Sequence, residues 1–260
     1  MKIAVIGGGA AGFIAAITAK ELNPQSRVNI FEKTEQALSK VKISGGGRCN
    51  VTNATFGIAR LIKNYPRGGS QLRKSFNLFN VKHTVQWFES RGIALKIEAD
   101  KRMFPSSNNS HTIVNLLLET TNELGINISY KSKVRDIAHS EKGVELSVNN
   151  ELLSFNRVII ATGGTPKANG FDWLTVLGYR ISLPIPSLFT FNMPKDPITD
   201  LMGVSVPNVV ASIKGSNFKQ SGPLLITHWG MSGPAILKLS AFAARYLLSL
   251  IHISEPTRPY

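Results

Sequence analysis

The chain has 260 residues and an ordinary globular composition, so it can bury a large core and form one or two domains. Its single cysteine, Cys49, excludes an internal disulfide and a dithiol redox pair, and no apolar run is long enough to span a bilayer. The formal charge is +14, and because the chain starts on a predicted strand without signal-peptide features, we expect a cytoplasmic protein with no membrane segment.

The first 32 residues predict a strand, a glycine turn, a helix and a second strand. Gly7, Gly9 and Gly12 fit the G-x-G-x-x-G pattern, in which the glycines allow a tight turn, close approach of a pyrophosphate and close packing of the helix. The free N–H groups of the helix N-terminus would face the phosphates. Glu32 follows twenty residues after Gly12, where a carboxylate can accept from ribose hydroxyls. This order predicts a dinucleotide site rather than a plain βαβ unit.

Residues 33–57 are expected to form a glycine-rich loop around the run Ser44–Asn53, SGGGRCNVTN. Its three glycines would let the backbone wrap a flat or anionic ligand, and Arg48 offers a charged fork. A flexible spacer is the alternative. The density of polar residues favours a binding loop.

Residues 70–92 predict one helix with a mainly apolar face that ends at Gly92. Basic residues gather at Arg60–Lys82 and at Lys96–Arg102. They favour either a solvated surface that attracts phosphate-bearing cofactors or a nucleic-acid surface. We find no RNA-binding signature and no interleaving of aromatic and basic residues, so we expect a small-molecule substrate and no nucleic-acid partner.

A helix is predicted from Ser110 to Leu124, followed by short β runs over residues 126–160 that suggest a β-meander. The meander leads into a buried strand and the turn Ala161–Gly164, ATGG. Glycines after a strand let a backbone approach a cofactor at the carboxyl end of a sheet. This turn, together with the N-terminal motif, indicates FAD rather than NAD.

The composition of the sequence changes near residue 184, where prolines begin to separate short predicted β segments. We therefore predict an α/β fold: a Rossmann-like FAD-binding domain with a β-meander over residues 1–184, interrupted by a β-rich second domain over residues 185–248. A helix is expected over residues 233–250.

With the N-terminal motif, the run SGGGRCNVTN resembles the BaiN-like bacterial NAD(P)/FAD-dependent oxidoreductases of the glutathione-reductase-like FAD superfamily. Further matching segments are Arg102–Pro105, Ala161–Gly164 and Gly222–Pro234. The resemblance covers residue 1 to about residue 250. It implies a flavoprotein oxidoreductase.

The resemblance also implies roles for individual residues. The ADP half of FAD would be held by Gly7, Gly9, Ala10, Ala11, Gly12 and Glu32, with Lys33 beside the ribose. The pyrophosphate and isoalloxazine would be lined by Ser44, Gly45, Gly46, Gly47, Arg48, Cys49 and Asn50. Val134 would offer its backbone to the adenine, and the site would be closed by Ala161, Thr162, Gly163 and Gly164.

Members of that family continue beyond the point at which this chain stops. Residues 249–260 do not follow the family pattern, so we expect a non-native tail on a truncated protein. Recovery of the full reading frame would test this expectation.

The resemblance predicts that NAD(P)H, as a transient reductant, reduces FAD, and that the flavin passes hydride to an organic acceptor such as an activated carbon–carbon double bond. His228 lies in a family motif and is the candidate acid or base, while Cys49 is either a reactive thiol or a packed residue. No histidine spacing indicates a metal site. Two alternatives stay open: an FAD-dependent RNA-modifying protein, and a non-catalytic flavin or nucleotide binder. The oligomeric state is not predicted.

Overall fold

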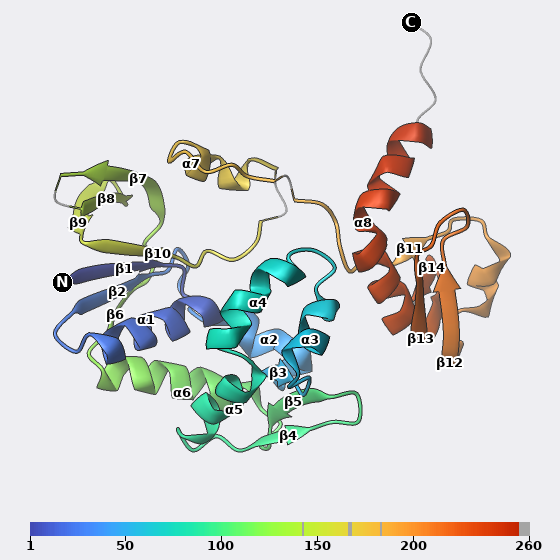
Figure 1. Ribbon diagram of the computed structural model, residues 1–260, viewed down its shortest axis with the longest axis horizontal. Helices are drawn as coiled ribbons and strands as arrows, with labels where there is room; N and C mark the ends of the chain where they lie inside the picture. Colours follow the sequence, from blue (N-terminus) through green and yellow to red (C-terminus); the bar gives the residue numbers. More distant parts are fainter. Residues whose placement is uncertain (142, 166–167, 183, 255–260) are drawn as a thin grey trace, which may run out of the picture. The chain divides into compact units, whose positions relative to one another are not determined.

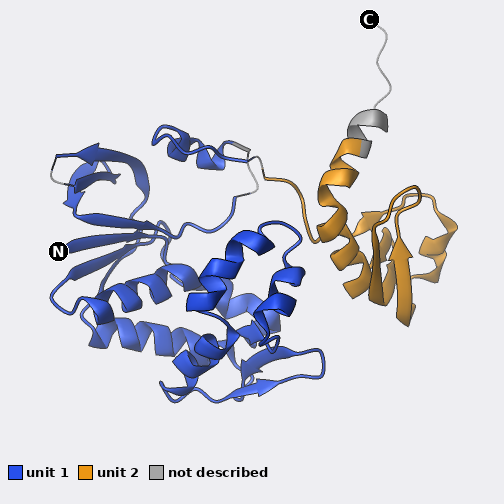
Figure 2. Ribbon diagram, viewed as in Figure 1, with its two compact units in different colours: residues 1–182 blue, residues 183–260 orange. Residues whose placement is uncertain are grey.

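The computed structural model describes residues 1–141, 143–165, 168–182 and 184–254. The chain divides into two compact units, Met1–Ser182 and Leu183–Tyr260, which Figure 2 colours separately. Of the expected non-native tail, residues 249–254 are helical and residues 255–260 lie outside the described residues.

Unit 1 is built on a four-stranded sheet with the order β10-β1-β2-β6, in which all neighbouring strands are parallel (Figure 1). The strands are β1 (Lys2–Ile6), β2 (Arg27–Phe31), β6 (Asn127–Ser129) and β10 (Arg157–Ile160). A parallel sheet is covered on both faces, which explains why β1 is apolar at nearly every position rather than alternating.

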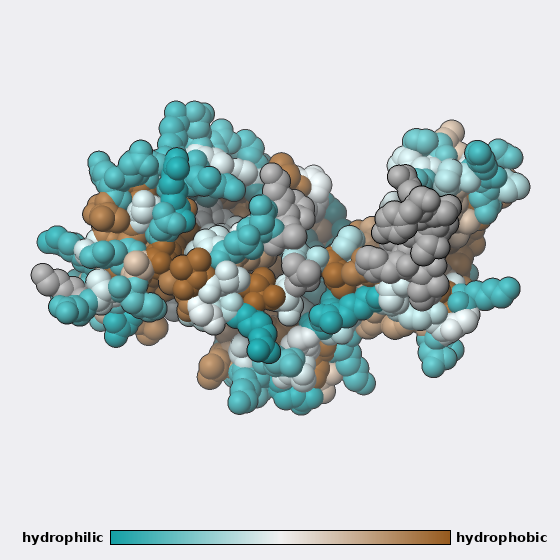
Figure 3. Space-filling view, turned by 90° about the horizontal axis from the view of Figure 1, so that it is seen from above, coloured by the Kyte–Doolittle hydropathy of each residue, from teal (hydrophilic) through white to brown (hydrophobic). Residues whose placement is uncertain are grey.

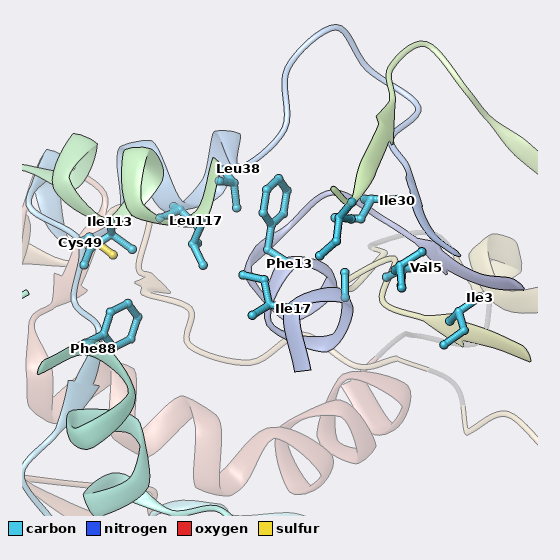
Figure 4. Close-up of a cluster of buried hydrophobic side chains, with 14 residues drawn as sticks. Ile3, Val5, Phe13, Ile17, Ile30, Leu38, Cys49, Phe88, Ile113 and Leu117 are labelled. Atoms are coloured by element: carbon cyan, nitrogen blue, oxygen red, sulfur yellow. The ribbon is translucent and has the colours of Figure 1, made fainter. Parts of the chain in front are cut away.

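Two helices cover one face of this sheet and a β-meander covers the other (Figure 1). The helices are α1 (Ala10–Leu22) and α6 (Ser110–Glu123), and the meander consists of β7 (Val134–Ser140), β8 (Gly143–Val148) and β9 (Glu151–Phe155). Ile3 and Val5 of β1 join the core beneath the helices with Phe13 and Ile17 of α1 (Figure 4), while Ala4 packs on the meander side. Successive side chains of β1 therefore point to opposite faces of the sheet and pack into two different cores.

A small antiparallel sheet with several short helices completes unit 1. Its strands are β3 (Thr52–Asn53), β4 (Leu95–Ile97) and β5 (Arg102–Pro105), and the helices are α2 (Ser39–Gly47), α3 (Ile58–Leu61), η1 (Ile62–Asn64), α4 (Gly69–Leu78) and α5 (Val81–Glu89). The first half of α2 is helical where a loop was expected over residues 33–57, whereas Ser44, Gly45 and Gly46 have non-helical backbone angles. The short elements η2 (Ala168–Phe171) and α7 (Asp172–Thr175) follow β10.

The prediction of one helix over residues 70–92 is wrong, because the chain breaks between α4 and α5 at Asn80. The Asn80 side chain accepts from Lys82 N at 3.0 Å, and the Asn80 N–H donates to Nδ1 of His83 at 3.1 Å. This capping box starts a new helix and leaves the Phe79 side chain 48% exposed. The apolar periodicity continued through the cap, which concealed the break.

Unit 2 is a four-stranded antiparallel sheet with the order β11-β14-β13-β12, packed against one long helix. Its elements are β11 (Phe191–Asn192), η3 (Pro197–Leu201), β12 (Ser205–Ser212), β13 (Lys219–Thr227), β14 (Gly230–Ser232) and α8 (Pro234–Ser254). Leu224 and Ile226 alternate along β13 and meet Ile236 of α8 in the core of this unit.

The fold class predicted from the sequence is confirmed: a Rossmann-like α/β unit with a β-meander is followed by a β-rich unit. Polar residues cover most of the molecular face drawn in Figure 3, with small apolar patches between them. None of the described helices is long and apolar enough to cross a membrane.

Candidate dinucleotide-binding site

The turn between β1 and α1 is shaped by glycines that tolerate no side chain. Gly7 has a φ of +112°, and an added Cβ would lie 2.4 Å from the Ala161 carbonyl oxygen at the end of β10. A Cβ on Gly12 would lie 1.9 Å from the Gly7 carbonyl oxygen. At Gly9, in contrast, an added Cβ would meet no atom within 4 Å. The turn is therefore tightly packed on its inner side and open at Gly9, as an approaching phosphate requires.

Hydrogen bonds fasten this turn to β2 and to the start of α2. The Gly7 N–H donates to the Phe31 carbonyl at 2.9 Å, and the Gly8 carbonyl accepts from Leu38 N at 2.8 Å. The Glu32 carboxylate accepts from Gly8 N at 2.9 Å through Oε2 and from Thr34 N at 2.8 Å through Oε1. Glu32 thus orients the glycine turn as well as facing the position expected for a ribose.

A cavity of about 470 Å³ lies beside Glu32, and we call it the Glu32 cavity. Of the residues predicted from the sequence, it is lined by Gly7, Glu32, Lys33, Val134, Thr162, Gly163 and Gly164. Phe171 and Trp173, which were not predicted, add aromatic surface to the same wall. This combination of backbone, carboxylate and aromatic groups suits an adenosine.

A second cavity of about 450 Å³, the Cys49 cavity, opens on the other flank of the glycine turn. Of the predicted residues, it is lined by Gly9, Ala10, Ala11, Ser44, Cys49, Asn50, Ala161 and Gly163. Phe88, Ile113 and Leu117 contribute an apolar wall that the sequence motifs did not indicate. Gly163 lines both cavities, so the ATGG turn borders each of them.

The N-terminus of α1 borders the Cys49 cavity through Gly9, Ala10 and Ala11. No side chain of the described residues caps this helix end, and its first turn holds no acidic residue. Its backbone N–H groups and positive dipole end are therefore open to an anion. Lys40 also lines the Cys49 cavity, and its Nζ lies 3.9 Å from the position of a Cβ built on Gly163. No motif in the sequence indicates Lys40, because its place beside the cavity depends on how α2 packs.

The glycine loop Ser44–Asn50 holds a specific backbone shape. A Cβ on Gly45, whose φ is +57°, would lie 2.8 Å from both the Asn50 backbone nitrogen and Cε1 of Phe104. Gly46 and Gly47 face open space. The Asn50 amide, with its nitrogen turned toward the carbonyl oxygens, donates to Thr52 at 2.9 Å and to Met103 at 3.3 Å. The loop is thus anchored to β3 and β5 and exposes only its middle.

Arg48 does not line either cavity, although it was expected to offer a charged fork to the ligand. Its Nη1 donates to Oε1 of Glu98 at 2.5 Å, and its guanidinium carbon lies 4.1 Å from the centre of the Phe104 ring. The guanidinium is therefore engaged in holding the loop against the turn between β4 and β5.

The Cys49 thiol is buried among apolar side chains, and the residue is only 6% exposed. Burial raises the pKa of this thiol above its ordinary value, and a hydrogen bond with Ser44 opposes the shift. A protonated thiol is a poor nucleophile, so the structure favours the packed role for Cys49 over the reactive one.

His228 lies in unit 2, in the exposed turn between β13 and β14. Its ring contacts Trp229 edge-to-face, with 4.4 Å between the ring centres. Among the described residues, no group of three His, Cys, Asp or Glu side chains is close enough to hold a metal ion.

The fold, the glycine turn and the paired cavities define a Rossmann-type dinucleotide-binding protein. The chain belongs to the HI0933-like family: the family's Rossmann domain matches residues 1–183, and its barrel and H2TH domain matches residues 185–253. This is the BaiN-like family of FAD-dependent oxidoreductases that the sequence motifs resemble.

Two relatives cover nearly the whole chain. It is 26% identical over 254 residues to the 3-dehydro-bile acid delta(4,6)-reductase of Clostridium scindens, covering 95% of this chain and 61% of that protein. It is 28% identical over 250 residues to the ribosomal RNA dihydrouridine synthase of Escherichia coli, covering 92% of this chain and 60% of that protein. The chain thus spans about three fifths of the length of these relatives.

Among solved structures, the open conformation of a flavocytochrome c3 fumarate reductase is similar over 63% of this chain and 33% of that chain. The two sequences are 22% identical, and the TM-score is 0.48.

Proposed function

We propose that this chain binds FAD in an extended form across the Glu32 cavity and the Cys49 cavity. The observation that carries this proposal is that Gly163 lines both cavities, while Gly7 lines one and Gly9 the other. A ligand with two bulky ends joined by a pyrophosphate would place the pyrophosphate at the N-terminus of α1.

Each part of the cofactor then has its own residues. The adenosine would lie in the Glu32 cavity, against the Val134 backbone, Phe171 and Trp173. The pyrophosphate would meet the N–H groups after Gly9 and the Lys40 ammonium. The isoalloxazine would lie toward the apolar wall of the Cys49 cavity, where exclusion of water would protect a reduced flavin from side reactions.

For the reaction, we propose NAD(P)H-dependent reduction of a carbon–carbon double bond conjugated to a carbonyl group. The names of both relatives denote saturation of such a bond, in a dehydro-bile acid and in a uracil ring. When bound, FAD supplies the hydride for this chemistry. The protein must orient the acceptor and donate one proton to the carbon next to the carbonyl group, and we propose His228 as that donor.

Binding of FAD is tested by titrating the purified chain and following the change in flavin fluorescence. Gly9→Asp is the diagnostic variant, because its side chain has room and an aspartate at this helix cap supports the fold. The added carboxylate would repel the pyrophosphate, so we expect at least tenfold weaker binding with an unchanged or higher melting temperature. Gly9→Ser, which is neutral, is the matched control. A folded wild-type chain that binds no FAD would overturn the proposal.

The electron donor is tested by adding NADH or NADPH to the FAD-loaded protein without oxygen and recording the absorption of oxidised flavin. Loss of that absorption with either nucleotide supports the enzyme and identifies its reductant. Stable absorption with both nucleotides would favour a non-catalytic flavin binder.

RNA modification is a second candidate, because the relative with 28% identity is named a ribosomal RNA dihydrouridine synthase. Because that relative acts on RNA, a nucleic-acid partner is not excluded for this chain. The two candidates share the bond type and differ in the molecule that carries it. Incubation with NADPH and either RNA or a steroid enone, followed by mass spectrometry for the gain of two hydrogen atoms, separates them.

A further inference from the structure

Positive charge is concentrated in one segment of unit 1. Residues 36–88 contain nine basic residues and no acidic residue, so this fifth of the chain carries nine of its fourteen net charges. The rest of the chain holds 21 basic and 16 acidic residues, so its charge is far more nearly balanced. A run of like charges is usually a solvated surface. Whether it forms a binding surface depends on whether the structure gathers the charged side chains in one place.

Five of these basic side chains are exposed on the module formed by α3, η1, α4 and α5, which we call the basic helical module. They are Arg60, Lys63, Arg73, Lys74 and Lys82. None of them forms an ion pair with an acidic side chain of the described residues. The helix α4 has no fully buried residue: Phe76 packs partly buried against Leu61 and Val81, and Arg73 and Lys74 are exposed.

The second basic cluster, Lys96–Arg102, differs because it contains two acidic residues, Glu98 and Asp100, that pair with Arg102. Nε of Arg102 lies 2.6 Å from the Asp100 carboxylate, and its Nη2 lies 3.4 Å from Glu98. The basic helical module therefore gathers five exposed cations that pair with no acidic side chain of the described residues. Like charges repel one another across such a surface, and a polyanion would relieve that repulsion.

Aromatic rings are exposed among these cations, which corrects the expectation of no interleaving. Phe56, just before α3, and Tyr65 and Phe79 of the module are 51%, 41% and 48% exposed, and they alternate in sequence with the basic residues. The Phe79 ring stacks on His83 with 5.9 Å between ring centres. Exposed rings between cations suit unstacked nucleotide bases and their phosphates. Two of the three large apolar side chains exposed on the module, Tyr65 and Phe79, are aromatic, the third being Leu78, and this favours RNA over a lipid surface.

We propose that the basic helical module is a binding surface for single-stranded RNA. Its cations would contact phosphates, which sets affinity without reading sequence, and its exposed rings would stack on bases. Binding of RNA at this surface does not depend on the flavin. Reduction of a base carried by that RNA does rest on the proposed function.

The test measures fluorescence anisotropy of a labelled oligouridylate with the full chain over a series of salt concentrations. The variant is Arg73→Gln/Lys74→Gln on α4, and the matched control is Lys214→Gln/Lys219→Gln, which removes two exposed lysines of unit 2. We expect the α4 variant to bind about tenfold more weakly, and the salt slope to fall by about 0.7 for each phosphate that the variant no longer neutralises. The control should retain the wild-type affinity.

Two further measurements keep the outcomes separate. Melting curves show whether the variants fold, and FAD titration shows whether the cofactor site is intact. Absence of RNA binding at low salt, or equal weakening by both variants, would overturn the inference. Tighter binding to anionic lipid vesicles than to RNA, with the same weakening in the α4 variant, would show that the ligand of this surface is a membrane and would overturn the inference. RNA binding by a protein that fails to bind FAD would refute the proposed function and would still support this inference.

Discussion

Arg48 and Glu98 form an ion pair with 2.5 Å between Nη1 and Oε1, which ties the glycine loop to the turn between β4 and β5. Arg102 reaches the other oxygen of the same carboxylate at 3.4 Å, and both guanidinium groups lie near the Phe104 ring. Two segments that resemble the family motif, SGGGRCN and RMFP, are therefore parts of one structural clamp. The clamp fixes the loop that borders the Cys49 cavity.

Glu98→Gln is expected to loosen this clamp. The variant removes the charge that two arginines share, and because both partners are partly exposed, the free energy of unfolding should fall by only about 1 kcal/mol. Urea denaturation followed by circular dichroism measures the change. Glu89→Gln is the control, since Glu89 is exposed and has no ion pair with a described residue. Equal destabilisation by both variants would contradict a clamp role for Glu98.

Gly12→Ala is expected to destabilise unit 1 far more than Gly9→Ala. The new Cβ at residue 12 would lie 1.9 Å from the Gly7 carbonyl oxygen, so the backbone of helix or turn must move at a cost of about 3 kcal/mol. At Gly9 the Cβ meets open space, and the loss of a glycine cap costs less than about 1 kcal/mol. Thermal melting of both variants checks the order. Similar melting temperatures for the two variants would show that the turn has room for a Cβ at residue 12.

Lys40→Gln is expected to weaken FAD binding by about fivefold at low salt, because it removes a cation beside the position proposed for the pyrophosphate. The melting temperature should not change, since Lys40 is exposed and unpaired with any described acid. Lys42→Gln on the same helix is the matched control, because Lys42 lines neither cavity. FAD titrations at two ionic strengths measure the effect. Weakening of the same size in both variants would point to general electrostatics rather than to direct contact.

Cys49→Ala is expected to change how stability depends on pH. Burial raises the pKa of the folded thiol above that of the unfolded chain, so the unfolded state loses its proton first as pH rises. The wild type should therefore lose unfolding free energy as pH rises from the ordinary thiol pKa to the raised one, and the alanine variant should lack that part of the decline. Urea titrations at several alkaline pH values measure this difference.

The same thiol offers a chemical check. Alkylation of Cys49 by iodoacetamide should be slow at neutral pH and should accelerate on unfolding, because only the thiolate reacts. Mass spectrometry of the labelled peptide follows the rate. Rapid labelling of the folded protein near pH 7 would mean an activated cysteine and would restore the catalytic interpretation.

Local sequence determined the elements around the glycine turn. The strand, the turn and the small-residue helix over residues 2–22, together with Glu32, need only the steric properties of glycine and the periodicity of apolar side chains. The β-meander and the long helix of unit 2 follow in the same way from alternation and helical spacing. The ATGG turn lies beside the first motif because β1 and β10 are parallel, and the carboxyl ends of parallel strands meet at one edge of a sheet.

Tertiary structure decided what each charged or buried side chain does. Arg48 is held by Glu98, which lies fifty residues away, so no local pattern could show that its guanidinium is occupied. Lys40 and the aromatic pair Phe171 and Trp173 reach the cavities only because separate elements converge there. Burial sets the pKa of Cys49, and burial is a property of the packed core rather than of the motif. Spacing along the chain therefore predicts a binding motif, whereas the partner of each ionic or polar group depends on contacts between distant segments.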